Sequence, residues 1–365
     1  DFLNTFYRGG YISHDKIDAG KNHLLPKNHV GIYTGMSAAY TWRNKNDTVR
    51  WDFTVAFRDR QAIHGLFTDD AYRLVFDGNE PYAGTTLDLG GTHFTAIHWQ
   101  QLQLEAKYFY PDGRSEIAFG FSLMNGTSMS EVSIDRGTLF TPTTGTSLDL
   151  GLTGSYYASD TASKKYFTNN GFGSCFNFRF STFLGNPDGR YRHQLSFSVQ
   201  DLGYMHWNSR SIVYTVDTTM HYTGADVSGA IINHEQVTGF PSADSIFGSK
   251  KVAQVITFLP IGIRARYVLL TPTPFWGGVE AKFWSNGDAL PMVTIFAGWR
   301  NAKNNFNVVS GVSGGGYGKI SVPLMLAWSP CRNFRIMAGC DNVAGEIAPK
   351  KTHAQGLFTN LSFAF

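Results

Sequence analysis

The 365-residue chain is short of charge and of long apolar runs. Charged residues make up 16% of it, against about 25% in an ordinary soluble domain. A membrane-spanning helix needs about 20 predominantly apolar residues, whereas the longest charge-free stretch, residues 89–104, is broken by Gly, Thr, His and Gln. The sequence therefore excludes a helical membrane protein. Its net charge of +3 also indicates no nucleic-acid partner.

Cysteine is scarce as well. Cys331 and Cys340 lie in what we predict as one strand, which would separate them by about 30 Å, too far for a disulfide bond. With Cys175, the three thiols lack the paired spacing of a zinc site, and the histidines are scattered. We predict no metal site and no cofactor.

No catalytic motif withstands inspection. Residues 311–315 match the G-x-S-x-G pattern of a nucleophile elbow, which needs a strand, a turn and a helix. Here the pattern continues through further glycines into another predicted strand, so we interpret it as a glycine-rich turn. We predict no catalytic residues and no enzyme.

Aromatic residues, by contrast, are abundant. They make up 15% of the chain, with 29 Phe, 17 Tyr and 8 Trp, although the mean hydropathy is only −0.18. A disordered chain would be poor in these residues. The composition indicates a β-rich protein with much aromatic surface.

Apolar and polar residues alternate with period two from about residue 30 to the end, which predicts strands. One hairpin is predicted around the turn at 111–114 and a second around 186–189, both with Asp-Gly turn chemistry. The apolar faces of these two hairpins carry Leu102, Leu104, Ala106, Tyr108, Tyr110, Ile117, Phe119, Phe121 and Leu123, and Phe176, Phe178, Phe180, Leu195, Phe197 and Val199. We count about 14 strands, with a range of roughly 12–16.

Three features favour an outer-membrane barrel over a soluble sandwich. Many strands reach the length of about 9–11 residues that a tilted crossing needs. Short turns alternate with long segments at 59–92, 158–170 and 224–251, as in barrels with short periplasmic turns. Aromatic residues gather near strand ends, as in interfacial girdles: Tyr108, Tyr110, Trp42, Trp207, Trp276, Trp284, Trp299 and Trp328. We predict an all-β fold, a closed antiparallel transmembrane β-barrel over residues 28–365.

The end of the chain resembles the terminal signal of bacterial outer-membrane barrels. Leu357, Leu361, Phe363 and Phe365 share one face of a last strand that ends on an aromatic residue. The resemblance implies recognition by the barrel-insertion machinery and residence in the bacterial outer membrane, in contact with lipid and lipopolysaccharide. We expect that a signal peptide has been cleaved.

Four segments carry a family resemblance: residues 51–53, 77–84, 201–207, where we predict a hairpin, and 335–343. They are similar to a Bacteroidetes-type outer-membrane β-barrel family of unknown function, which is distantly similar to long-chain fatty-acid transporter barrels and to barrel components of gliding and type IX secretion systems. The resemblance implies a fold and a membrane, and supplies no catalytic residues.

Charged residues recur on the inward-facing side of the predicted strands. We interpret them as salt-bridged pairs that brace a filled lumen; the alternative is an arginine-lined path that favours anions. The predicted lumen-lining set is Arg50, Asp52, Arg58, Glu105, Lys107, Glu116, Arg179, Arg190, Arg192, Asp217, Arg264, Arg266, Glu280 and Lys282, with Arg335 as a further inward charge.

Two further segments carry predictions. Residues 1–27 precede the first clear strand and form either a plug in the lumen or a partner-bound tail. Thr68 to Phe76 is predicted as a short helix with Thr68 as its N-cap and Asp69 and Asp70 in its first turn.

The sequence predicts only a general class of function. We favour a non-catalytic accessory or structural subunit of a larger outer-membrane secretion or assembly complex, with other outer-membrane or periplasmic proteins as partners. The alternatives are a fatty-acid-transporter-like channel for hydrophobic or anionic small molecules, and a soluble sandwich that binds carbohydrate through its aromatic residues.

Overall fold

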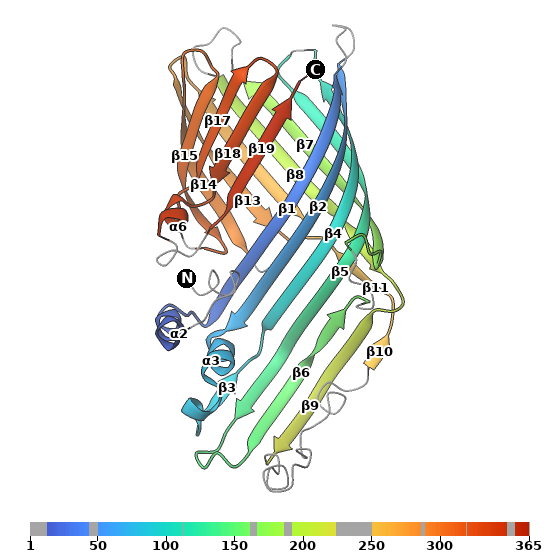
Figure 1. Ribbon diagram of the computed structural model, residues 1–365, viewed down its shortest axis with the longest axis vertical. Helices are drawn as coiled ribbons and strands as arrows, with labels where there is room; N and C mark the ends of the chain where they lie inside the picture. The colour runs from blue at the N-terminus through green and yellow to red at the C-terminus, as the bar shows by residue number, and fades with distance from the viewer. Residues whose placement is uncertain are drawn as a thin grey trace.

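In the computed structural model, the described residues are 13–43, 50–111, 113–160, 166–185, 192–223, 250–285, 289–318, 320–348 and 355–364. Strands dominate this part of the chain (Figure 1). None of the helices in it has the length and apolar character that a membrane crossing requires.

The elements have the following bounds. The helices are α2 (His14–Lys21), α3 (Asp69–Asp77), the 3-10 turn η1 (Glu80–Tyr82) and α6 (Val343–Ile347). The strands are β1 (Lys27–Arg43), β2 (Trp51–Thr68), β3 (Thr86–Asp88), β4 (Thr92–Phe109), β5 (Glu116–Phe140), β6 (Leu148–Ala158), β7 (Gly171–Leu184), β8 (Arg192–Trp207), β9 (Ile212–Tyr222), β10 (Lys250–Val252), β11 (Val255–Phe258), β12 (Gly262–Leu270), β13 (Phe275–Trp284), β14 (Leu290–Arg300), β15 (Phe306–Gly316), β16 (Ile320–Ser321), β17 (Leu324–Cys331), β18 (Phe334–Cys340) and β19 (Leu357–Phe363).

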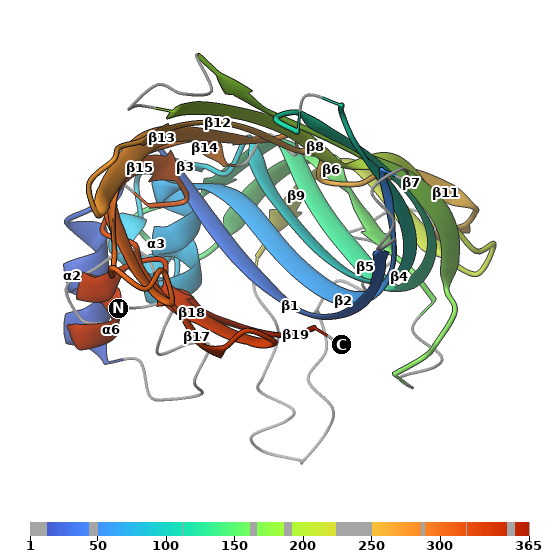
Figure 2. The same ribbon diagram turned by 90° about the horizontal axis from the view of Figure 1, so that it is seen from above.

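One antiparallel ladder organises these strands. It runs β1–β2–β4–β5–β7–β8–β12–β13–β14–β15–β17–β18–β19, which is thirteen strands among the described residues. The ladder curls round into a barrel (Figure 2), so the predicted all-β, antiparallel architecture is confirmed. Within the described residues, no backbone pairing joins β1 to β19, and predicted closure stays a prediction.

Connection length differs between the two ends of the barrel. Short turns at 110–115, 271–274, 301–305 and 332–333 lie at the end that holds the C-terminus (Figure 1). The other end carries α2, the segment from α3 to β3, and α6. The predicted helix after Thr68 is confirmed as α3, whose first turn is capped by a 3.0 Å hydrogen bond from the Ala71 amide to Thr68 Oγ1.

The ladder forks within β5. Residues 116–126 of β5 pair with β7, whereas residues 130–140 pair with β6, which continues to β9 and β10. Two hydrogen bonds join Met129 and Ser159 at the fork: the Ser159 amide donates to the Met129 carbonyl at 2.8 Å, and the Met129 amide donates to Ser159 Oγ at 2.9 Å. Asn170 also holds the fork by donating to the carbonyls of Thr127 and Asp160 at 2.8 and 2.9 Å. The extension β6–β9–β10 therefore projects away from the ladder, as Figure 1 shows.

The outward face of the ladder is an apolar belt. Its exposed residues include Tyr40, Trp42, Trp51, Phe53, Phe57, Leu102, Leu104, Phe119, Phe121, Leu123, Phe176, Leu195, Phe197, Val279, Phe283, Val293, Ile295, Trp299, Val312, Leu326, Trp328, Leu361 and Phe363. On β2, β4 and β5 the belt ends at an outer polar row, Asp59, Gln100 and Asn125. Between that row and the short-turn end of the barrel, no outward position of the described ladder strands carries Asp, Glu, Lys or Arg.

Several predicted strand limits were wrong. β2 continues to Thr68, so the segment predicted to be irregular from residue 59 is ten residues shorter at its start. Polar residues break the apolar alternation there, yet the backbone stays paired on both sides, with β1 and β4. Cys331 and Cys340 end two different strands of one hairpin, β17 and β18, and both thiols are free.

A one-residue bulge in β8 changes which residues face inward. Phe178 pairs with Val199, but Phe176 pairs with Leu202, and Asp201 at the shift has φ 59°. Beyond it, Leu202 and Tyr204 are outward, whereas Met205 and Trp207 are buried inside. The predicted hairpin at 201–207 is therefore wrong, because these residues continue β8. Trp207 belongs to the interior rather than to the aromatic girdle, and so do Trp276 and Trp284, since Phe275 and Phe283 take the outward positions of β13.

A substitution at Gly203 tests the inward packing of β8 after the bulge. A Cβ there would lie 2.1 Å from the Ser174 carbonyl oxygen and 2.4 Å from Cys175 Cβ, whereas a Cβ on Gly262 would meet its nearest neighbour at 3.9 Å. Gly203→Ala is expected to destabilise the folded barrel by about 1–3 kcal/mol, as overpacking does, while Gly262→Ala stays near wild type. The measurement is the denaturant midpoint in detergent. Equal effects of the two substitutions would contradict the inward packing of β8.

Candidate functional site: the interior of the barrel

The interior brings together most of the predicted lumen-lining charges, in two separate groups. In the first, Lys107 Nζ lies 3.9 Å from Asp52 and 3.6 Å from Glu116. Arg179 donates to Glu105 at 2.7 Å. The register of β2, β4, β5 and β7 places these side chains in neighbouring inward positions.

The second group surrounds one carboxylate, Glu280 on β13. Arg264 donates to it through Nε at 2.7 Å, and Lys282 Nζ lies 2.9 Å from Oε1. Arg266 Nε is farther away, 3.9 Å from Oε2. Three cations therefore share a single buried carboxylate.

Four described residues of the predicted set belong to neither group, and they are Arg50, Arg58, Arg192 and Asp217. Arg50 precedes β2, where its carbonyl accepts from the Phe109 amide. Arg192 starts β8, with its guanidinium 5.7 Å from the Phe183 ring centroid. Asp217 lies in the β6–β9 extension, where Thr153 donates to it at 3.2 Å. Arg190 lies outside the described residues. Arg58 is half-buried on the inward face of β2.

The most buried interior ion pair was missed by sequence reasoning. Arg60 on β2 is paired with Asp201 on β8, and their side chains are only 11% and 9% exposed. Gln101 Nε2 donates to Ser122 Oγ at 2.8 Å and lies 3.4 Å from Asp201 Oδ1. Strand alternation alone could not find this pair, because the bulge turns Asp201 inward.

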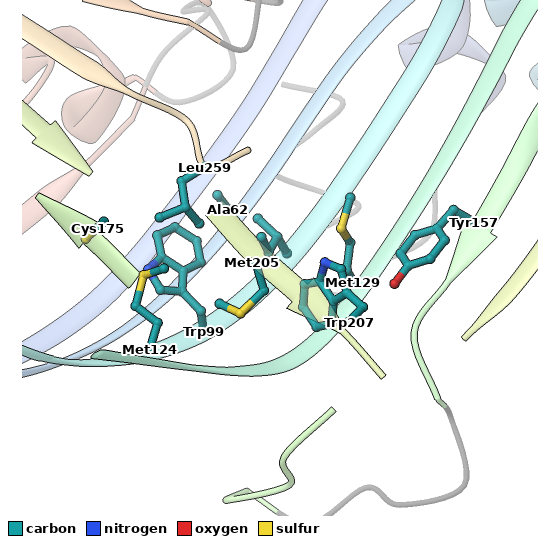
Figure 3. Close-up of a cluster of buried hydrophobic side chains, with 10 residues drawn as sticks. Ala62, Trp99, Met124, Met129, Tyr157, Cys175, Met205, Trp207 and Leu259 are labelled. Atoms are coloured by element: carbon teal, nitrogen blue, oxygen red, sulfur yellow. The ribbon is translucent and has the colours of Figure 1, made fainter. Parts of the chain in front are cut away.

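An apolar core cluster lies next to this pair. It consists of Ala62, Ile97, Trp99, Met124, Met129, Tyr157, Cys175, Met205, Trp207 and Leu259, most of them labelled in Figure 3. Trp207 and Met205 are 1% and 0% exposed, and the Trp207 indole donates to Thr257 Oγ1 at 2.9 Å. Side chains of β2, β4, β5, β6, β7 and β8 thus fill the interior at the fork, and Leu259, from the segment after β11, completes the cluster.

The strands from β12 to β19 differ in charge from those before them. In these strands the described residues include five basic side chains, Arg264, Arg266, Lys282, Arg300 and Arg335, and one acidic side chain, Glu280. In the ladder strands from β1 to β8, basic and acidic side chains are nearly balanced. One half of the interior wall is therefore cationic.

The outer polar row is a second feature that sequence reasoning missed. Asp59 accepts hydrogen bonds from Tyr166 at 2.7 Å and from Gln100 at 3.1 Å, and His98 Nε2 lies 3.2 Å away. Tyr166 comes from the segment between β6 and β7, which folds over this outward carboxylate. The row therefore marks where the apolar belt ends.

Helix α2 lies in the described part of the N-terminal segment, residues 13–27, and it packs on α3. Lys21 Nζ lies 2.6 Å from Asp77 Oδ2, and Tyr82 donates to Asp77 at 2.6 Å. Burial would raise the pKa of the Asp77 carboxyl, but the hydrogen bonds from Lys21 and Tyr82 outweigh it and hold the pKa below its usual value. The plug or tail role of residues 1–27 stays a prediction.

The terminal-signal residues lie on β19. Leu357, Leu361 and Phe363 occupy alternate outward positions and are 76%, 60% and 63% exposed. Phe365 lies outside the described residues. The three described residues share the outward face of β19, and the role of the four residues as an insertion signal stays a prediction.

The Asp77 contact predicts a pH dependence for the docking of α2. A carboxyl with a depressed pKa stabilises the folded contact above the ordinary Asp pKa of about 3.9, and this stabilisation is lost as the pH falls through the lower, folded value. Asp77→Asn should release α2 at neutral pH, measured as faster proteolysis of residues 22–26. Asp69→Asn, which removes an exposed 3.7 Å pair with Arg73, is the control and should leave the rate unchanged.

The Arg60–Asp201 pair predicts a larger loss of stability. Arg60→Gln leaves a buried carboxylate unpaired and should lower the free energy of unfolding by about 3–5 kcal/mol. Adding Asp201→Asn should restore part of that loss. Arg179→Gln removes a half-exposed pair and should cost at most about 1 kcal/mol. Unfolding midpoints in detergent check this, and equal losses for Arg60 and Arg179 would contradict it.

Comparison with known proteins gives distant structural likenesses. The toluene transporter TodX of Pseudomonas putida shares 7% identity, with 86% of this chain and 82% of TodX covered and a TM-score of 0.37. The ferric-catecholate import receptor Fiu of E. coli K12 shares 8%, with 91% and 58% covered and a TM-score of 0.31. This chain thus spans little more than half of Fiu. No curated protein matches the sequence. A family model matches residues 3–313, and the chain belongs to that family, the family of unknown function DUF5723.

Proposed function

We propose that the protein is an integral barrel of the bacterial outer membrane and serves as a non-catalytic subunit of a larger assembly there. The membrane location rests on the apolar belt. Its outward positions carry aromatic and aliphatic side chains and no charge up to the outer polar row, which is the pattern that lipid requires of a barrel wall. Aromatic residues at one border of the belt, such as Trp42 and Trp51, suit the membrane interface.

The observation that carries the subunit role is the open edge of the ladder. β1 has 17 residues and β19 has 7, and among the described residues no backbone bond joins them. Unpaired backbone groups facing lipid cost several kcal/mol each. A strand from a partner protein, added along β1, would satisfy them. The interior filling at the fork supports a role other than an open pore.

One side-chain contact already crosses the interior near this edge. Tyr317, in the turn after β15, contacts His64 on β2 through a hydrogen bond and a ring contact with centroids 5.7 Å apart. Its ring lies over Gly31 of β1, where a Cβ would come within 2.2 Å. This contact anchors the long-connection end of β1 and leaves the backbone edge of that strand accessible to a partner.

Mild-detergent extraction at native expression, followed by mass spectrometry of the intact complex, tests this proposal. We expect a stoichiometric protein partner. The contact between β1 and β19 is tested with pairs of introduced cysteines in a Cys331→Ser, Cys340→Ser background. Ala38→Cys with Thr359→Cys should form little disulfide if a partner strand separates β1 from β19.

Ala38→Cys with Phe57→Cys is the matched control, because these two residues are direct partners in the β1–β2 register. That pair should cross-link. A lone barrel whose 38–359 pair cross-links as well as the control would show direct closure and overturn the subunit proposal.

The second candidate is a channel for anionic or hydrophobic small molecules. The cationic wall of β12 to β19 favours it, because basic side chains lining a pore select anions. Anion-selective conductance in a planar bilayer would support this candidate. Conductance that stays at the level of bare lipid, even after removal of residues 1–27, would count against it.

A further inference from the structure

A cavity of about 240 Å³ lies in the cationic half of the interior, near the short-turn end. It is lined by Gln194, Arg266, Val268, Leu270, Trp276, Arg300 and Asn307. These residues come from five strands, β8 and β12 to β15, and the register places all of them on the inward face. The cavity is separate from the filled fork, whose cluster comes mainly from the strands before β12.

The cavity has an excess of positive charge. Among the described strands from β12 to β19, Glu280 is the one acidic residue, and Arg264 and Lys282 already bind it at hydrogen-bond distance. Arg266 is left 3.9 Å away, and its Nε is buried with no hydrogen-bond partner among the described residues. The Arg266 side chain is nevertheless 32% exposed and shares Glu280 with two nearer cations, so its charge favours an added anionic oxygen in the cavity.

The second guanidinium completes the polar side of the cavity. Arg300 uses Nη2 to donate to the Thr271 carbonyl at 3.3 Å, and an arginine has five N–H donors in all. The amides of Gln194 and Asn307 lie on the same lining. Two arginines and two amides match a planar carboxylate, which guanidinium groups bind in bidentate geometry.

The remaining wall is apolar and aromatic. The Trp276 ring lies over Gly298, where a Cβ would come within 2.3 Å of it, and it meets Phe296 edge-on with centroids 5.9 Å apart. The Arg266 guanidinium lies 4.8 Å from the Phe296 ring centroid, which restricts its orientation. Val268 and Leu270 complete this side. A ligand here would place an apolar, ring-sized body against an indole.

We propose that this cavity is a binding site for a small aromatic monocarboxylate, with the carboxylate held by Arg266 and Arg300 and the ring packed against Trp276, Val268 and Leu270. The volume of about 240 Å³ is below the 300–1,000 Å³ or so of pockets for drug-sized ligands, which suits a ligand with a single ring. This inference goes beyond the subunit role and holds whether or not the barrel conducts.

Calorimetry with the full chain in lipid nanodiscs tests the site, with benzoate as the probe and empty nanodiscs as the blank. Wild type is expected to bind benzoate. Arg266→Gln and Arg300→Gln should each weaken binding by roughly tenfold or more, as loss of a hydrogen bond to a charged group does. Trp276→Leu should weaken it by a smaller factor.

Arg335→Gln is the matched control. Arg335 is an inward arginine of the same cationic half, on β18, outside the cavity lining, so this variant should keep wild-type affinity. Heat-dependent gel mobility, which reports folding of each variant, excludes misfolding as the cause of a loss.

Four outcomes would overturn the inference. They are no benzoate binding by folded wild type, equal binding of neutral benzamide, equal binding of inorganic sulfate, and an Arg335→Gln loss equal to that of Arg266→Gln. Benzamide would show that charge is not recognised, and sulfate would show that the aromatic wall contributes nothing.

Discussion

The interior depends on a single bulged residue in β8. Because strand side chains alternate with period two, one inserted residue exchanges the two faces of everything that follows. Asp201, at φ 59°, is that residue. It turns itself toward Arg60 and brings Met205 and Trp207 into the core cluster, while Leu202 and Tyr204 take outward positions. Without the shift, an indole and a thioether would face outward and the fork would lose the side chains that fill it.

The same bulge shows how far the sequence predicted the structure. Where alternation is unbroken, as in the hairpin of β4 and β5, the inward and outward sets were predicted correctly, and so was the short helix after Thr68. The prediction failed where a bulge shifts the two-residue alternation, and where a polar residue lies on the outward face. β2 was predicted to end near Asp59, because an outward Asp looks like a loop residue until Tyr166 is seen to cover it.

The pairs within the interior could not be predicted for a related reason. Arg60 and Asp201 are 141 residues apart in the chain. Only the pairing of the intervening strands β4, β5 and β7 brings β2 and β8 to the same part of the interior. A local pattern gives the face of a residue but not its partner. The cavity is a clearer case still, because five strands contribute to it and none carries a motif.

The two halves of the barrel wall accommodate their inward-facing charged side chains in different ways. From β1 to β8, charges are nearly balanced and packing fills the interior at the fork, where the buried Arg60 is paired with Asp201. From β12 to β19, one carboxylate serves three cations and the inward positions include Gly298, Gly311 and Gly339. Trp276 lies against Gly298 beside a cavity of about 240 Å³, and the partly matched guanidinium group of Arg266 favours an anion there. A wall that only braced a barrel would need neither, and the coincidence of space with unmatched charge is what separates a ligand site from a structural network.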